Sequence, residues 1–90
     1  MKKLNLQYVA AVYPITRKLG EFYETDACTI GDLIRELDGK YGGFSEMFLD
    51  TAASVLTLNT MIYYGEIGSV PRGVLKPDQP ILDGATITFW

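Results

Sequence analysis

The chain ends in the feature that most restricts its fold, a strand that follows directly on a turn. Residues 81–90 read Ile-Leu-Asp-Gly-Ala-Thr-Ile-Thr-Phe-Trp, so an Asp-Gly turn signal precedes a run of β-branched and aromatic residues. Ile87 and Phe89 alternate with two threonines and Trp90, and this period of two predicts a strand with one apolar face. A strand at the end of a chain stays ordered only when another strand pairs with it. We therefore expect it to lie beside the first strand of the chain.

Chain length and hydropathy predict one small globular domain, residues 1–90. Ninety residues can support a single modest core and no second domain. The longest uninterrupted apolar run, Tyr8–Tyr13, is much shorter than the ~20 residues that a membrane-spanning helix requires. Asn5 and Gln7 interrupt the apolar stretch that a signal peptide would need after Met1. The sequence thus predicts a cytoplasmic protein with no membrane partner.

Acidic residues are concentrated in the middle of the chain. The net charge is −3, and the segment from Glu21 to Asp50 has eight acidic residues against two basic ones, Arg35 and Lys40. This distribution argues against binding to the phosphates of a nucleic acid, which requires a basic surface. Two interpretations stay open for the acidic segment: it attracts a basic protein partner, or it forms solvated faces of the fold.

The chain has almost none of the residues that hold metals or perform nucleophilic catalysis. Cys28 is its single cysteine and it has no histidine, so the sequence predicts no disulfide, no metal site, no iron–sulfur cluster and no cofactor. Without an imidazole to activate it, Cys28 is interpreted as a buried or incidental thiol. The acidic residues are scattered and form no acid/base pair, so we expect a protein that is not an enzyme.

The first half of the chain predicts two strands and a helix. Alternating apolar residues from Leu4 to Val12 predict a long strand that Pro14 ends, and residues 19–25 predict the second strand of a hairpin. Thr29 is predicted to cap a helix over Ile30–Asp38, and Gly39 to end it. The apolar face of this helix, at spacings of three, four and seven, comprises Ile30, Leu33, Ile34 and Leu37.

The second half predicts short strands and a long loop. Residues 55–58 and 61–64 read as extended runs on either side of Asn59-Thr60, and Gly65–Pro80 contains too many glycines and prolines for regular structure. One helix packed on one face of a mixed four- or five-stranded sheet accounts for this order, which is the α+β, ubiquitin-like β-grasp fold. We expect Leu33, Ile34 and Leu37 to pack on strand residues Leu4, Leu6, Leu58 and Ile87.

Three segments together resemble a known family. Residues 29–37 (Thr-Ile-Gly-Asp-Leu-Ile-Arg-Glu-Leu), 56–59 (Leu-Thr-Leu-Asn) and 81–87 (Ile-Leu-Asp-Gly-Ala-Thr-Ile) are similar, in this order, to segments of the small sulfur-carrier proteins of the MoaD/ThiS type. The resemblance covers nearly the whole chain and implies a ubiquitin-like protein. In that family, an E1-like enzyme adenylates a terminal Gly-Gly carboxylate, which becomes a thiocarboxylate for molybdopterin or thiamine synthesis.

The resemblance leaves two interpretations of function because Trp90 stands where the family continues into its Gly-Gly tail. In the first, which we favour, the protein has lost carrier chemistry and is a non-catalytic binding or accessory module. In the second, it is a true sulfur carrier whose tail is absent from the printed chain. The only Gly-Gly pair, Gly42-Gly43, lies in mid-chain and cannot serve.

Aromatic and basic residues of the second half predict a contact surface. Tyrosine and tryptophan are favoured anchors at protein interfaces, and arginine and lysine supply the positive charge of the long loop. The alternative is that the aromatic residues merely cover a small sheet. The predicted partner is an enzyme large subunit, an E1-like activating enzyme, or a second copy of the chain. The predicted partner-binding residues are Tyr64, Arg72, Lys76 and Trp90.

Overall fold

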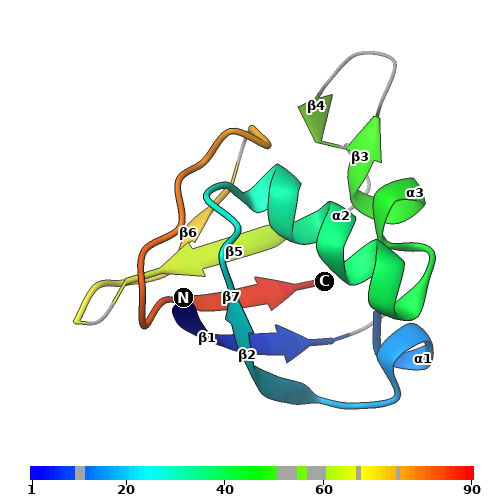
Figure 1. Cartoon of the computed structure of the whole chain (residues 1–90), viewed down its shortest axis with the longest axis horizontal. Coiled ribbons are helices and arrows are strands. Elements are labelled where there is room, and N and C mark those ends of the chain that lie inside the picture. The colour runs from blue at the N-terminus through cyan, green and yellow to red at the C-terminus, as the bar shows by residue number, and fades with distance from the viewer. Residues whose placement is uncertain (10–11, 51–54, 57–60, 67, 75) are drawn as a thin grey trace.

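A five-stranded mixed sheet forms the centre of the fold (Figure 1). The computed structural model describes residues 1–9, 12–50, 55–56, 61–66, 68–74 and 76–90. The sheet has the order β2-β1-β7-β5-β6, in which β1 and β7 are parallel and the other neighbours antiparallel. Its strands are β1 (Lys2–Tyr8), β2 (Gly20–Thr25), β5 (Ile62–Gly65), β6 (Arg72–Gly73) and β7 (Thr86–Phe89). The prediction that the last strand pairs with the first is confirmed.

The helix α2 (Ile30–Tyr41) lies across one face of this sheet (Figure 1). Two shorter helices, α1 (Tyr13–Thr16) and α3 (Phe44–Phe48), lie near one end of α2. The strands β3 (Leu49–Asp50) and β4 (Val55–Leu56) pair with each other in a separate two-stranded sheet. This arrangement is the predicted α+β, β-grasp architecture.

The start of α2 follows the prediction and its end does not. The Thr29 side chain caps the helix, because its Oγ1 accepts a hydrogen bond from the Asp32 amide at 3.2 Å. The predicted end at Gly39 is wrong, since the helix continues to Tyr41. The stop lies at Gly42, whose positive φ of 81° favours glycine and whose amide donates to the Asp38 carbonyl at 2.8 Å.

The first strand is shorter than its alternating pattern predicts. It ends at Tyr8 rather than Val12, and Val12 is buried at the N-cap position of the helix α1. Pro14 lies in the first turn of α1, where the missing amide hydrogen costs no helical hydrogen bond. Proline therefore helps to start a helix at this position instead of ending a strand.

The second half also differs from the prediction in part. The predicted loop Gly65–Pro80 contains the short strand β6, which extends the main sheet. Val55–Leu56 is extended as expected, but it pairs with β3 and not with the main sheet. Leu58 and Asn59 lie outside the described residues.

The core lies between α2 and the sheet. Leu33, Ile34 and Leu37 are fully buried in the same cluster as the strand residues Leu4, Leu6 and Ile87, as predicted. Aromatic rings fill the end of the core beneath α3. The Phe89 ring of β7 lies 5.3 Å from Phe48, 5.5 Å from Phe44 and 6.1 Å from Tyr8, measured between centroids. The last strand is thus held by packing as well as by pairing.

Candidate functional site

The face of the sheet opposite α2 carries an open, partly aromatic surface. Side chains alternate along a strand, so residues between the buried ones point away from the core. On this outer face the centre is polar, and the Thr88 hydroxyl donates to Gln7 Oε1 at 3.0 Å. No helix of the described residues covers this face (Figure 1). Phe22 of β2 is 79% exposed on it and Trp90 is 46% exposed.

Trp90 is held in place beside β5. Its amide donates to the Met61 carbonyl at 2.9 Å, so the hydrogen-bonding pattern of β7 continues to this residue. Its ring meets the Tyr63 ring edge to face, with centroids 6.3 Å apart and planes at 75°. Tyr63 and Trp90 therefore form a positioned aromatic pair on the outer face. The sequence pointed to Trp90 and missed Tyr63, although strand alternation places both residues on one face.

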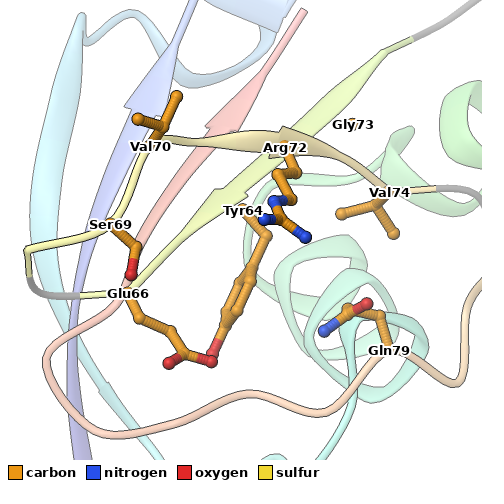
Figure 2. Close-up of a pocket in the computed structure, with 8 residues that line it drawn as sticks. All are labelled: Tyr64, Glu66, Ser69, Val70, Arg72, Gly73, Val74 and Gln79. Atoms are coloured by element: carbon orange, nitrogen blue, oxygen red, sulfur yellow. The ribbon is translucent and has the colours of Figure 1, made fainter.

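A second feature, a cleft of about 460 Å³, lies beside β5 and β6 (Figure 2). Its polar walls come from Glu66, Ser69, Arg72 and Gln79, and its apolar walls from Val70, Val74 and the ring of Tyr64. Tyr64 is only 7% exposed, and its hydroxyl accepts a hydrogen bond from the Leu82 amide at 2.9 Å. This bond ties β5 to the turn before β7 and fixes the floor of the cleft.

The four residues predicted to bind a partner do not form one patch. Tyr64 and Arg72 face each other across β5 and β6 and both line the cleft. Trp90 lies on the outer face with Tyr63, whereas Tyr64, the next residue on the strand, points to the inner side. Lys76 is exposed and does not line the cleft. The other walls of the cleft could not be predicted from the sequence, because they come from a segment without periodicity.

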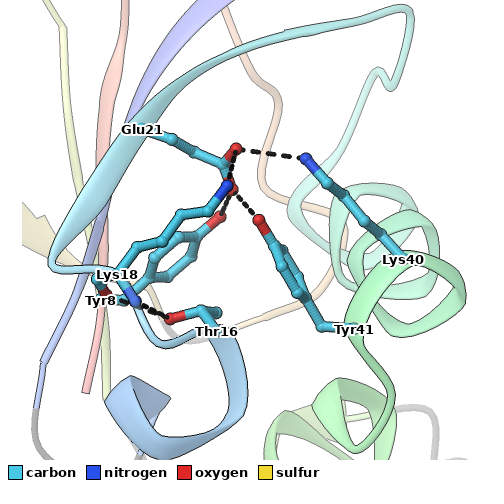
Figure 3. A network of polar contacts seen from close by, with 6 residues as sticks. All are labelled: Tyr8, Thr16, Lys18, Glu21, Lys40 and Tyr41. Carbon is cyan, nitrogen blue, oxygen red and sulfur yellow. Dashed lines mark hydrogen bonds and ion pairs between the residues drawn. The ribbon is translucent and has the colours of Figure 1, made fainter.

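A third feature is a part-buried polar cluster around Glu21 of β2 (Figure 3). The Tyr8 hydroxyl donates to Glu21 Oε2 at 2.7 Å, and the Tyr41 hydroxyl donates to the same oxygen. Lys40 Nζ lies 3.2 Å from Glu21 Oε1, and Lys18 Nζ lies 3.4 Å from it. The carboxylate thereby joins β1, β2 and the end of α2.

The electrostatics of this cluster indicate a structural role. Burial alone would raise the pKa of Glu21, but hydrogen bonds from Tyr41, Tyr8 and Lys40 outweigh it and lower the pKa to about 2. Burial, with the bond to Glu21, raises the pKa of Tyr8 above its ordinary value. At neutral pH the carboxylate is therefore charged and the phenol protonated. Proton transfer requires pKa values near the working pH, and the shifts move the pKa values of Glu21 and Tyr8 away from it.

The described part of the chain gives little support for a metal site, a buried thiol or a membrane-spanning helix. Among the described residues, the cysteine, aspartate and glutamate side chains include no group of three or more that could hold a metal ion. Cys28 is exposed, so its interpretation as a buried thiol is wrong. Of the two interpretations, that of an incidental thiol is the one that remains. None of the described helices is long and apolar enough to cross a membrane.

Comparison with known proteins identifies the fold. No protein-family model and no curated protein matches the chain. The Haloferax volcanii HVO 2177 protein is similar at 16% identity and a TM-score of 0.76, over 98% of this chain and 80% of that one. Molybdopterin converting factor, subunit 1 from Pyrococcus furiosus is similar at 20% identity and a TM-score of 0.65, over 99% and 95%. SAMP1 from Haloferax volcanii is similar at 16% identity and a TM-score of 0.66, over 98% and 92%.

These likenesses confirm that the chain has a ubiquitin-like β-grasp fold, as the sequence predicted. They also agree with the sequence resemblance to MoaD-type proteins at the level of the fold, since one similar structure is a molybdopterin converting factor subunit. At sequence identities of 16–20%, the structural likeness shows the fold alone. The role of this chain therefore has to be inferred from its own surfaces.

Proposed function

We propose that this chain is a non-catalytic, ubiquitin-fold binding module that docks on a partner protein through the outer face of its sheet. The observation that carries the proposal is the Tyr63–Trp90 pair, a fixed aromatic contact on a sheet face that no described helix covers. Buried aromatic anchors surrounded by polar groups dominate the energetics of protein interfaces. The polar centre of the face, with Gln7 and Thr88, provides such surroundings.

The kind of partner follows from charge and from the similar structures. The segment from Glu21 to Asp50 is strongly acidic, and although α2 carries part of this charge on the opposite side of the sheet, the charge favours the approach of a partner with a basic surface. The Pyrococcus furiosus protein is called subunit 1 of a converting factor, a name that implies a second subunit. An enzyme large subunit or an E1-like activating enzyme is therefore our first choice, and a second copy of the chain is the other.

Replacing Trp90 with alanine is expected to weaken this association by about 1–3 kcal/mol and to leave the fold intact. The ring is 46% exposed, so its loss removes an anchor and not a core residue. Tyr13→Ala is the matched control, because Tyr13 is equally exposed but lies on α1. Binding titrations with the candidate enzymes measure the first kind of partner, and sedimentation velocity measures self-association.

Two results would contradict this assignment. If Trp90→Ala unfolds without a cooperative transition, the residue belongs to the core and the docking surface lies elsewhere. If Trp90→Ala leaves the association unchanged, the outer face is excluded as the docking surface.

The second candidate function is that of a sulfur carrier, favoured by the three sequence segments and by the name of the Pyrococcus furiosus protein. Carrier chemistry acts on a glycine carboxylate, which an unhindered tail presents in a narrow channel. As a binding module, the protein is expected to gain no sulfur when incubated with ATP, an E1-like enzyme and a sulfur donor. Intact-mass measurement checks this, and oxygen-to-sulfur exchange at the terminal carboxylate would favour the carrier over the module.

A further inference from the structure

The cleft beside β5 and β6 contains a cation, Arg72, that has no partner among the described residues. Arg72 is exposed in its wall, and its guanidinium forms no ion pair or hydrogen bond with any other described residue. In the view of Figure 2 the guanidinium points to the side of the cleft where Val74 and Gln79 lie. Guanidinium groups bind carboxylates through two parallel hydrogen bonds, so this position suits a carboxylate ligand.

The same cleft has an open backbone edge. The Val74 amide donates to the Ile62 carbonyl at 2.7 Å, and Arg72 pairs with Tyr64. In an antiparallel ladder, the residue between two hydrogen-bonded positions directs its amide and carbonyl away from its neighbour. Gly73 is that residue, and β6 is the outermost strand. The amide and carbonyl of Gly73 therefore point toward the free edge of the sheet.

We propose that this cleft binds the C-terminal end of a peptide, with its free carboxylate on Arg72 and its main chain along the edge at Gly73. The last side chain of the peptide would lie against Val70, Val74 and the Tyr64 ring, the apolar part of the walls. A short edge strand with free backbone groups is a common place for an extended peptide to add to a sheet.

The negative charge of Glu66 restricts the class of ligand further. Glu66 lines the cleft at the hydroxyl end of Tyr64 in Figure 2 and has no ion-pair partner among the described residues. A second negative charge near it would be repelled, which disfavours phosphate dianions and acidic peptides. The ligand class is thus a peptide that carries a single carboxylate at its C-terminus and ends in a small apolar residue. The proposed peptide site is separate from the outer face of the sheet. It therefore does not depend on the docking function proposed for that face.

The test is a titration followed by ¹H–¹⁵N correlation spectra of the whole chain. The probes are acetyl-Gly-Gly-Val with a free carboxylate, the same peptide as its C-terminal amide, N-acetylvaline and inorganic phosphate. We expect the free acid to shift the amide signals of the cleft walls and Gly73, and the amide form to bind at least about tenfold more weakly. N-acetylvaline and phosphate should also bind more weakly, because neither reaches both the guanidinium and the edge.

Variants of two exposed arginines provide the matched comparison. Arg72→Gln is expected to reduce affinity for the free acid at least about tenfold, while Arg35→Gln, on the exposed side of α2, leaves it unchanged. Spectra outside the cleft should stay the same in both variants, which shows that the fold is kept. The proposal is overturned if the amide peptide or N-acetylvaline binds as well as the free acid. It is equally overturned if Arg72→Gln has no effect, or if several millimolar peptide shifts no signal of the cleft.

Discussion

The Leu37→Ala variant is expected to lose about 2–5 kcal/mol of the free energy of unfolding. Leu37 is fully buried on the face of α2 that packs on the sheet, within the cluster formed with β1 and β7. Removing its side chain takes apolar contacts from the core and leaves a cavity that the surrounding strands can fill only in part. Urea or guanidinium unfolding, followed by circular dichroism, measures the change.

The control for this variant is Leu19→Ala. Leu19 is 74% exposed just before β2, so the same chemical change should alter stability by no more than about 0.5 kcal/mol. A loss below about half a kcal/mol for Leu37→Ala would show that the packed face of α2 has been assigned wrongly. Domains of this size are stable by only about 5–15 kcal/mol, so the expected difference is easily resolved.

The Glu21→Gln variant is expected to lose about 1–3 kcal/mol at pH 7. Glutamine keeps the size of the side chain and one acceptor oxygen, but it removes the charge that faces Tyr8, Tyr41 and Lys40. Glu24→Gln is the matched control, because Glu24 follows on the same strand, is exposed, and has no ion pair or side-chain hydrogen bond among the described residues. We expect the control to unfold at the same denaturant concentration as the parent chain.

The pH dependence of stability provides a sharper measurement of the same cluster. The pKa of Glu21 is about 2 in the folded chain and ordinarily about 4.5, so the unfolded chain binds its proton first as the pH falls. The stabilisation is therefore complete above about pH 4.5 and is lost as the pH approaches 2. This difference corresponds to on the order of 3 kcal/mol. Between pH 5 and 2 the parent chain should lose more stability than Glu21→Gln, and parallel profiles would contradict the assignment.

Local patterns predicted most of the fold because its elements obey short-range rules. The cap at Thr29 and the apolar spacing of α2 are fixed within a few residues, and both are confirmed. Element ends were harder to predict. A glycine such as Gly39 is tolerated within a helix, and a proline such as Pro14 can begin one, so neither residue type by itself marks an end.

The candidate sites could be predicted only in part because they depend on long-range placement. Alternation correctly separates Tyr63 from Tyr64 onto opposite sides of β5. The cleft around Arg72, however, exists only because β6 joins the sheet, and nothing in a segment rich in glycine and proline indicates that pairing. The Glu21 cluster likewise joins residues 13 and 20 positions apart, which no local spacing relates.

The central place of β7 has a consequence for how the chain acquires its fold during synthesis. β7 lies between β1 and β5, and it pairs Tyr8 with Phe89 at the far end of the sequence. Closing so long a stretch of chain costs entropy before any of the pairing is gained, and contacts of this separation slow folding. Until residues 86–89 are available, β1 has only β2 beside it in the main sheet, and β5 lacks its inner neighbour. The main sheet can therefore form at most as two separate strand pairs, β1–β2 and β5–β6, and these join only when β7 pairs with both.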